Sequence, residues 1–553
     1  MAALSRTYAI LLSASLTLTF PFITLAQDAI PGEIHGNFQM DMQYYNSDTI
    51  IGAPDVPEKV LSRGFSNLNY TLGNFTAGVR FESYLNTLQG FDPRYEGTAF
   101  PYRYATYKVE GMEITVGNFY EQFGNGLIFR SYEEWGLGYD NVMDGIRVKG
   151  SPYKGVYVKG IIGKQRSFMS QGPGIVRGFD AELVVNELFD SSEAKSTLIL
   201  GGSFISKYQV DQDPIYILPE NVGAWAGRVN FISGKFNLNA EYAYKINDPS
   251  LINGYIYKPG ESLMLSASYS KKGFGLIVSA KRIDNMDFRS DRSAGGTDLS
   301  INYLPSTTKV HTYSLAAYYP YATQPNGEMG MQIELFYKFK KGSALGGKYG
   351  TGITINYSTV SSLAKEAIND TTQIGETGTL GYKSDFLAIG DEAYFSDFNI
   401  DITKKFSKKI KAVFSYVNLL YNKDVVQGLS GYGTVFADIG IIDITYKIKS
   451  KRTLRMEFQR MSTMQDDRSW VQVLAEYTMA PNWFFAVFDE HNYNNIKSEK
   501  RLHYFTIQGG YKKKGNTITV GYGRQRAGIF CVGGVCRNVP ASNGITLALT
   551  SSF

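Results

Sequence analysis

Histidine and cysteine are scarce in this chain, with four and two residues, and the spacing of the residues that could act as catalysts does not favour catalysis. The four histidines are scattered, and none lies in a recognisable nucleophile motif: His35, His311, His491 and His503. A general base must lie within hydrogen-bond reach of its partner. Glu133 and Glu134 are adjacent, so in a strand they would point to opposite faces and could not form an acid/base pair. We therefore expect no enzyme activity and no catalytic residue.

The two cysteines, Cys531 and Cys536, flank the sequence Val-Gly-Gly-Val. In an oxidising compartment, two cysteines around a Gly-Gly turn are typical of a disulfide that closes the tip of a hairpin. A metal site needs more than two ligands, and this loop offers only the two cysteines because it contains no histidine. The sequence therefore predicts a Cys531–Cys536 disulfide, no metal site and no cofactor.

Residues 117–145 hold the densest group of aromatic, glycine and charged residues. The glycines permit close backbone approach and the aromatic rings offer flat contact surfaces. Two interpretations remain open. The first is a constriction loop folded into a lumen, or a sugar-contacting surface, and the second is an ordered external loop that packs on a barrel rim. The candidate residues of this loop are Phe119, Tyr120, Glu121, Arg130, Glu133, Asp140 and Asp144.

The element type that carries these residues follows from a repeated period of two. From Ile34 onwards apolar and polar residues alternate, and the same pattern recurs at 75–82, 225–231, 236–245, 331–339, 398–403 and 454–459. In each case one face is apolar or aromatic and the other is polar, often charged. Such alternation predicts β-strands with one apolar face.

Three features separate these strands from those of a soluble β-sandwich. They are about ten residues long, which suits a tilted membrane crossing. Their apolar faces carry Tyr and Phe towards the strand ends, as interfacial girdles do, and short and long connections alternate. The sequence therefore predicts an all-β protein, a single transmembrane antiparallel β-barrel over residues 33–553. Strict up-and-down alternation gives about 26 strands. The alternative is 24, because the strands near 298–304 and 328–340 are assigned partly from the requirement that the number of strands be even.

Residues 1–26 have the pattern of a secretory signal peptide. Arg6 precedes an apolar stretch, Pro21 interrupts it, and Thr24-Leu25-Ala26 supplies small residues at a cleavage site. Only residues 27–32 separate this site from the first strand, so we expect no plug domain before the barrel and no domain after it. The expected location is the bacterial outer membrane, with both termini in the periplasm.

The last ten residues resemble the C-terminal signal that the outer-membrane assembly machinery recognises. Leu547, Leu549 and Phe553 share one face of the final strand, and the sequence stops at the aromatic residue. The alternative is an ordinary edge strand, but a closed barrel removes the exposed edge that such a strand would leave. Outer-membrane lipid and this machinery are the partners expected from the pattern.

Charge and hydropathy exclude other classes. The 56 basic and 51 acidic residues give a net charge of +5, which is too balanced for a nucleic-acid footprint. No apolar run of spanning length follows the first thirty residues, so we expect no transmembrane helix in the mature chain. The inward face carries charges of both signs, which predicts an interior that is hydrated or filled by polar loops and is not a dry core.

The segment from Gly117 to Gly145, with Phe-Tyr-Glu-Gln-Phe-Gly at 119–124 and Asp-Asn at 140–141, resembles an uncharacterised family of outer-membrane barrels from the Bacteroidota. The resemblance extends over most of the mature chain. It implies the location and the barrel architecture, and it carries no activity that can be assigned to particular residues.

Two functions are consistent with these expectations. The leading one is a channel or transport component for hydrophilic solutes, occluded by the 120–142 and 361–390 loops, because a barrel of this size with an empty lumen would breach the permeability barrier. The alternative is a structural or export-associated subunit closed by a periplasmic or surface partner protein. A third possibility is binding of glycans by aromatic residues of 119–139 on the outside.

Overall fold

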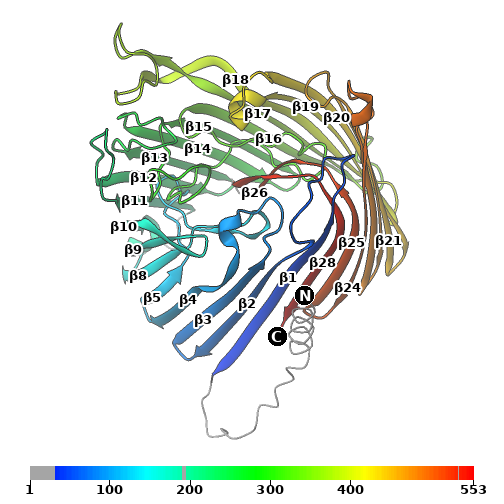
Figure 1. The fold of residues 1–553 in the computed structure, drawn as a ribbon, viewed down its shortest axis with the longest axis horizontal. Coiled ribbons are helices and arrows are strands. Elements are labelled where there is room, and N and C mark those ends of the chain that lie inside the picture. Colours follow the sequence, from blue (N-terminus) through cyan, green and yellow to red (C-terminus); the bar gives the residue numbers. More distant parts are fainter. Residues whose placement is uncertain (1–31, 190–194, 533–534) are drawn as a thin grey trace, which may run out of the picture.

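One closed antiparallel sheet forms the body of the protein. The computed structural model describes residues 32–189, 195–532 and 535–553, so the predicted signal peptide lies outside the described residues. Twenty-four strands form a single sheet that curves into a barrel (Figure 1). The predicted all-β barrel architecture is therefore confirmed.

The wall strands follow one another in chain order, and each pairs with its neighbours. The first half comprises β1 (Glu33–Asn46), β2 (Val60–Leu72), β3 (Phe75–Leu85), β4 (Gly97–Val109), β5 (Met112–Phe119), β8 (Met143–Tyr153), β9 (Val156–Ser167), β10 (Ser170–Val184), β11 (Ser196–Tyr208), β12 (Asn221–Ser233), β13 (Phe236–Lys245) and β14 (Gly260–Lys271). The second half comprises β15 (Phe274–Asp284), β16 (Glu328–Phe339), β17 (Thr351–Glu366), β18 (Lys383–Lys405), β19 (Ile410–Asn422), β20 (Thr434–Lys449), β21 (Arg452–Ser462), β22 (Trp470–Met479), β23 (Trp483–His491), β24 (His503–Lys513), β25 (Asn516–Gln525) and β28 (Ser542–Ser552).

Several short elements lie outside the wall. The short elements are η1 (Pro93–Tyr95), β6 (Glu133–Glu134), η2 (Trp135–Leu137), β7 (Tyr139–Asp140), α2 (Val185–Leu188), α3 (Lys423–Gln427), η3 (Ser498–Lys500), β26 (Gly528–Val532) and β27 (Val535–Val539). The strands β6 and β7 pair only with each other, and so do β26 and β27. In the wall, β5 therefore pairs directly with β8, and β25 pairs directly with β28.

The barrel closes where the first strand meets the last. In the β1–β28 pair, Met42 lies opposite Leu547 and Met40 lies opposite Leu549. The backbone of Gly36 and that of Phe553 exchange two hydrogen bonds, each 3.0 Å long. No edge of the sheet is left unpaired at this seam, which removes the liability of an open edge. The role of Leu547, Leu549 and Phe553 as an assembly signal stays a prediction.

The two ends of the barrel differ in their connections. At one end, called the turn end, most hairpins have tight turns such as 73–74, 110–111 and 450–451, and β1 begins there. At the opposite end, called the loop end, most connections are long, as at 120–142, 285–327 and 526–541. Short and long connections thus alternate as predicted, and they separate by end as they do in outer-membrane barrels.

The outward face of the wall is apolar. Leu238, Phe179 and Val487 expose 48%, 50% and 52% of their surface, although they lie in the middle of long strands. Their neighbours one residue away point to the inside of the barrel, because side chains alternate across a strand. Arg228 and Glu241, which face each other on β12 and β13, are buried there. In the described part of the chain, no helix is both long and apolar enough to cross a membrane.

The count of 24 wall strands matches the alternative prediction and replaces the value of about 26. Two strands were assigned partly from the even strand number. One of them is present, since residues 328–339 form β16. Residues 298–304 form no wall strand, apart from an isolated bridge between Arg289 and Ser300. Their alternation of Leu299, Ile301 and Tyr303 with polar residues arises because the segment packs inside the barrel, where one of its sides is also apolar.

Candidate functional site

The first candidate segment, residues 120–142, lies against the inner wall of the barrel and is called the first inner segment. It follows Phe119, the inward-facing last residue of β5, which is 2% exposed. Its central side chains are fully buried against inward-facing residues of the wall, including Val176 of β10 and Ile205 of β11. The buried central residues are Phe123, Leu127, Ile128 and Phe129.

This packing corrects one expectation about the interior. The charged inward positions predicted that the barrel would contain no dry core, yet the first inner segment forms an apolar cluster with Ala224, Ala226 and Ala243. These alanines lie at inward positions of β12 and β13, where small side chains leave room for the rings of the segment. Polar groups and a local apolar core therefore coexist inside the same barrel.

Backbone groups of the first inner segment also bind the wall directly. The Asn125 amide donates to the Glu241 carboxylate of β13 over 2.7 Å. The Lys159 ammonium of β9 donates to the Gln122 carbonyl over 3.1 Å, and the Arg147 guanidinium of β8 donates to the Tyr120 carbonyl over 3.0 Å. Charged donors and acceptors of the wall thus satisfy polar backbone groups that would otherwise be buried without partners.

A buried ion-pair network joins the first inner segment to β3 and β9 of the wall. Arg80 of β3 lies 2.8 Å from Glu133 and 2.8 Å from Asp140. Arg166 of β9 lies 2.8 Å from Asp140 and 2.6 Å from Glu82 of β3. Removing one member of such a buried network would leave charges uncompensated, which is strongly unfavourable. The network therefore holds the segment at a defined position.

Tyr120 completes this network as a neutral donor. Its hydroxyl donates to Asp140 over 2.9 Å. Burial and the nearby carboxylates of Asp140 and Glu133 hold the pKa of Tyr120 well above its ordinary value, so the phenol keeps its proton. Burial and the charge of Asp140 also raise the pKa of Glu133, although Arg80 opposes this shift.

Glu121 is held by a separate group of cations from the wall. Its carboxylate lies 2.6 Å from the ammonium of Lys149, 3.3 Å from that of Lys159 and 3.6 Å from the guanidinium of Arg147. Burial alone would raise the pKa of Glu121, but the hydrogen bond from Lys149 and the charge of Lys159 outweigh it and lower the pKa. Glu121 is therefore ionised and paired at neutral pH.

Two further candidate residues lie in different places. The guanidinium of Arg130 stacks 4.3 Å from the Tyr132 ring and 4.1 Å from the Tyr303 ring, between the two inner segments. Asp144 lies on β8 on the same outward face as Ile146, and it pairs with Arg103 at 3.1 Å. Because the strand begins at Met143 and alternates sides, Asp144 faces away from the lumen, unlike the other six candidates.

A second inner segment, residues 285–327, was not expected from the sequence to lie in the lumen. Near its start, Phe288 and Ile301 join the apolar cluster of the first inner segment. The Arg130 amide donates to the Ile301 carbonyl over 2.8 Å, and the Tyr303 amide donates to the Gly126 carbonyl over 2.9 Å. The two segments therefore pack together as one body inside the barrel.

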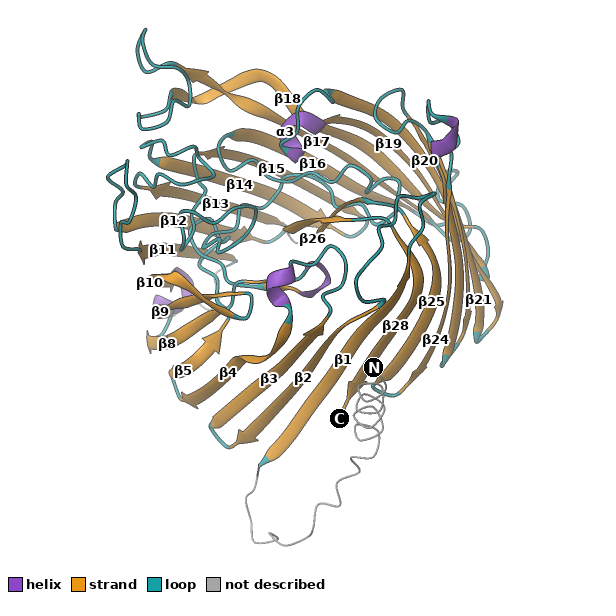
Figure 2. Ribbon diagram, in the orientation of Figure 1, coloured by secondary structure: helices purple, strands orange, loops and turns teal. Residues whose placement is uncertain are grey.

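The second inner segment then reaches the opposite side of the wall. Lys309 lies 2.6 Å from Asp401 of β18, and the His311 ring lies 2.7 Å from Asp397 of the same strand. The Leu315 amide donates to the Gln459 side chain of β21 over 2.9 Å. Further along, Leu315 and Tyr319 pack in a second apolar cluster with residues of β17–β22. The segment thus crosses the lumen, as the loops inside the barrel in Figure 2 show.

The 361–390 region, which was expected to occlude the lumen, lies at the loop end of the barrel. Its two ends belong to β17 and β18, which extend past the neighbouring strands as a hairpin (Figure 1), and residues 367–382 connect them. Its connection contacts the 246–259 loop, where the Tyr257 amide donates to the Thr379 carbonyl over 2.7 Å. The Tyr382 hydroxyl of this region donates to the Asn326 carbonyl of residues 285–327 over 2.9 Å, and a role of the 361–390 loop in occlusion stays a prediction. Within residues 285–327, the tyrosine-rich run 318–321 was the local sequence signal for a segment that packs inside the barrel.

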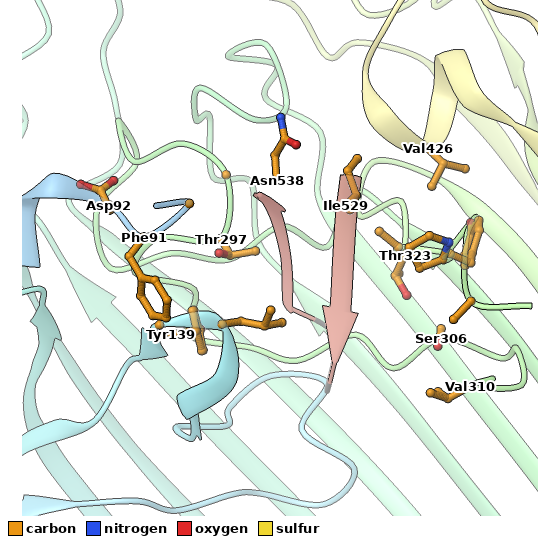
Figure 3. Close-up of a pocket in the computed structure, with 18 of the residues that line it drawn as sticks. Phe91, Asp92, Tyr139, Thr297, Ser306, Val310, Thr323, Val426, Ile529 and Asn538 are labelled. Carbon is orange, nitrogen blue, oxygen red and sulfur yellow. The ribbon is translucent and has the colours of Figure 1, made fainter. Parts of the chain in front are cut away.

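The β26–β27 hairpin also turns inward and contacts η2 of the first inner segment. A cavity of about 1600 Å³ lies between the two inner segments, this hairpin and the wall. Figure 3 shows Ile529 and Asn538 of the hairpin among the lining residues, with Tyr139 and Thr323 of the inner segments. Its lining includes charges of both signs, such as Arg166, Lys309 and Asp298.

Solvent access differs between the two halves of the lumen. Near the loop end, the inward-facing Lys207, Lys245 and Lys281 are 0%, 0% and 2% exposed. Nearer the turn end, the inward-facing Ile277 and Phe336 are 45% and 41% exposed. The inner segments therefore fill the part of the barrel near the loop end, and a vestibule remains open at the turn end.

The cysteines lie in the β26–β27 hairpin, where Cys531 and Cys536 are directly opposite each other in the backbone register. Their side chains lie outside the described residues, so the disulfide stays a prediction. Among the residues that the structure describes, no group of three or more His, Cys, Asp and Glu side chains is arranged to hold a metal ion. The prediction that none is bound remains untested.

Several solved structures are similar in general shape. The P pilus usher (PapC) translocation pore is 9% identical, with a TM-score of 0.43 over 94% of this chain and 99% of that chain. The siderophore receptor PirA from Pseudomonas aeruginosa is 10% identical, with a TM-score of 0.41 over 94% and 80%. The outer membrane transporter YddB from Escherichia coli is 8% identical, with a TM-score of 0.41 over 94% and 81%. Likenesses at this level carry no argument about function.

No curated protein matches the chain significantly. A family model does match it, under the description "Family of unknown function (DUF6029)", over residues 6–553. The predicted resemblance to an uncharacterised family is thereby confirmed, and the Bacteroidota origin stays a prediction. Because the match extends over nearly all of the sequence, the chain belongs to DUF6029, a family of unknown function.

Proposed function

We propose that this protein is a bacterial outer-membrane barrel that takes part in the transport of hydrophilic solutes, with a lumen that is closed at rest by the two inner segments. The observation that carries the proposal is the path of the second inner segment, which is bound at Ser300 by Gln165 of β9 and at Lys309 by Asp401 of β18. A barrel of more than about 16–18 strands would otherwise leave a wide aqueous channel.

The apolar outward face supports the membrane location. Side chains such as Phe179 and Leu238, exposed by 50% and 48%, would be unfavourable in water over the whole circumference of a barrel. In this proposal the signal peptide at 1–26 directs export, and the assembly machinery recognises Leu547, Leu549 and Phe553. The turn end, with both termini, faces the periplasm, because short turns face that side in such barrels.

The polar contents of the lumen support passage of hydrophilic solutes. The cavity between the inner segments is lined by charged groups, including Arg289, Asp291 and Arg526, and the vestibule at the turn end is open to solvent. Displacement of the second inner segment would connect the cavity with this vestibule. Opening requires that the Lys309 and His311 contacts break, since they fix the middle of the segment.

Swelling of liposomes that contain the purified protein tests this function. We expect slow uptake of sugars by the wild type and rapid uptake by a variant that lacks residues 121–140, with an upper limit in solute size. An empty liposome preparation is the control. If both proteins leave the liposomes impermeable to every sugar, the transport proposal is wrong.

A second function, a structural or export-associated subunit, is favoured by exposed apolar residues at the loop end. Leu387 and Ile389 on the projecting part of β18 are 82% and 60% exposed, and Ile217 in the 209–220 loop is 88% exposed. Apolar residues exposed in this way mark protein contacts when they form a patch. Copurification of a stoichiometric partner that is lost on Leu387→Ser and Ile389→Ser substitution would support this alternative.

A further inference from the structure

The turn end carries an arc of basic residues between β12 and β25, called the basic rim, which is interrupted only at the β22–β23 turn, where residues 478–484 contain no Lys or Arg. The turns 233–236, 270–274, 338–351, 404–411, 447–453, 478–484 and 511–516 contain no Asp or Glu. Two other connections at this end carry acidic residues, because Glu110 and Glu113 lie at the β4–β5 turn and Glu187 lies in α2. The rim cations are Lys235, Lys271, Lys272, Lys338, Lys340, Lys341, Lys348, Lys404, Lys405, Lys408, Lys409, Lys411, Lys447, Lys449, Lys451, Arg452, Lys512, Lys513 and Lys514.

Within the part of the chain that the structure describes, the rim cations form no ion pairs with acidic side chains. By contrast, several cations inside the barrel are paired, as Lys149 is with Glu121. Lys404 donates only to the Leu345 carbonyl and the Thr351 hydroxyl. So many like charges in one arc repel one another unless anions lie nearby. The rim is therefore suited to an external anion.

The position of the rim indicates which anion it meets. Outward-facing aromatic residues lie close to the rim cations, including Tyr337, Tyr446 and Trp483, which are 40%, 36% and 47% exposed. The ammonium of Lys271 lies 6.0 Å from the centre of the Tyr269 ring and 5.5 Å from that of Phe274. Aromatic rings and snorkelling lysines together mark the interface between hydrocarbon and headgroups.

Part of the rim faces the lipid directly. Lys271 shares the outward face of its strand with Tyr269, two residues before it, and Lys513 shares the outward face of β24 with Tyr511. Lys404 and Arg452 have the same outward position on β18 and β21. A soluble partner in the periplasm cannot reach the sides of these strands when the barrel is in a membrane. Lipid phosphates lie at that depth.

We propose that the basic rim binds the phosphate groups of anionic phospholipids in the membrane leaflet at the turn end. The proposal rests on the membrane location proposed above and is independent of transport. Juxtamembrane lysines and arginines attract anionic headgroups, and each one near the surface adds to the affinity. The one-sided arc, over β12–β25, places the bound lipids on that part of the circumference.

Native mass spectrometry of the purified barrel with phosphatidylglycerol or phosphatidylcholine tests the proposal. One variant carries Lys271→Gln, Lys404→Gln, Arg452→Gln and Lys513→Gln, which removes outward cations. A second carries Lys340→Gln, Lys341→Gln, Lys408→Gln and Lys409→Gln, which removes cations at the tips of turns. The matched control carries Lys59→Gln, Lys383→Gln, Lys497→Gln and Lys500→Gln at the loop end. Heat-modifiable migration in a gel verifies that each variant is folded.

We expect the wild type to retain phosphatidylglycerol in preference to phosphatidylcholine, and the outward variant to bind phosphatidylglycerol about tenfold more weakly. The control should bind like the wild type. The proposal is overturned if the wild type does not distinguish the two lipids or if the control loses as much binding. Loss confined to the turn-tip variant would also overturn it, in favour of an acidic soluble partner. None of these results depends on whether the barrel transports solutes.

Discussion

The ammonium of Lys309 lies 2.6 Å from the carboxylate of Asp401, and this pair connects two parts of the molecule that are far apart around the barrel. Lys309 belongs to the second inner segment, whose earlier residues pack against β9 and β15. Asp401 faces inward from β18. The segment is fixed on both sides, and in the proposed function its position determines whether the lumen is closed. The predictions below test this arrangement one contact at a time.

Breaking the anchor on β18 should increase the permeability of the barrel. The double substitution Lys309→Gln and His311→Gln removes the pairs with Asp401 and Asp397, so the second inner segment should leave the lumen more often. We expect faster sugar uptake into liposomes than with the wild type. The control is Lys59→Gln with His35→Gln, which are exposed residues. Equal uptake by the two double variants would show that these contacts do not hold the lumen closed.

Removing the buried guanidinium of Arg166 should destabilise the protein markedly. The Arg166→Met substitution leaves Glu82, which is 0% exposed, with less charge compensation, and it also removes a partner of Asp140. Breaking a buried pair in this way costs about 3–5 kcal/mol. The free energy of unfolding from denaturant titration in detergent measures the effect. Arg94→Met is the control, since Arg94 is 59% exposed to solvent where it pairs with Asp92 and Asp298, and its loss should cost about 0–1 kcal/mol.

A side chain at Gly124 should disturb the first inner segment. Gly124 has a φ of +52°, and a Cβ there would lie 2.5 Å from the Glu241 carboxylate. Gly73 has a similar φ of +55°, with nothing within 4 Å of its Cβ position. Gly124→Val should therefore lower the free energy of unfolding by about 2 kcal/mol more than Gly73→Val, because only the first variant is overpacked. Equal losses in the two variants would mean that backbone strain explains the whole effect.

Acidification should weaken the anchor at Glu121. The pKa of Glu121 is lowered in the folded protein, so its contribution to stability is present above the unfolded value of about 4.3 and is lost as the pH falls through the folded value. Sugar uptake by the wild type should therefore rise only below about pH 4. Glu121→Gln should remove this part of the pH dependence. Identical pH profiles for the two proteins would contradict the assignment.

The wall of the barrel could be predicted well from the sequence, because the period of two is a local property of each strand. The pattern around Arg228 and Val229 gave the correct inward and outward faces, and the same holds for Glu241 and Ala240. The long and short connections could also be assigned to opposite ends. Strand number was less certain, because residues 298–304 alternate like a strand and yet pack inside the lumen.

The contents of the lumen could be predicted only in part. The dense group of aromatic and charged residues at 117–145 marked the first inner segment, and six of its seven candidate residues lie at the inner wall or between the inner segments. The second inner segment depends on contacts such as that of His311 with Asp397, which join positions distant in sequence. No local pattern encodes such contacts, since the wall must first close before they can form.

Single-channel conductance in planar bilayers tests the closed lumen most directly. The wild type would be compared with a variant in which a short glycine-serine linker replaces residues 286–326, so that β15 still connects to β16. We expect the wild type to be silent and the variant to conduct in large, steady steps. Large steady conductance of the wild type, or a folded variant that remains silent, would contradict closure of the lumen by the second inner segment.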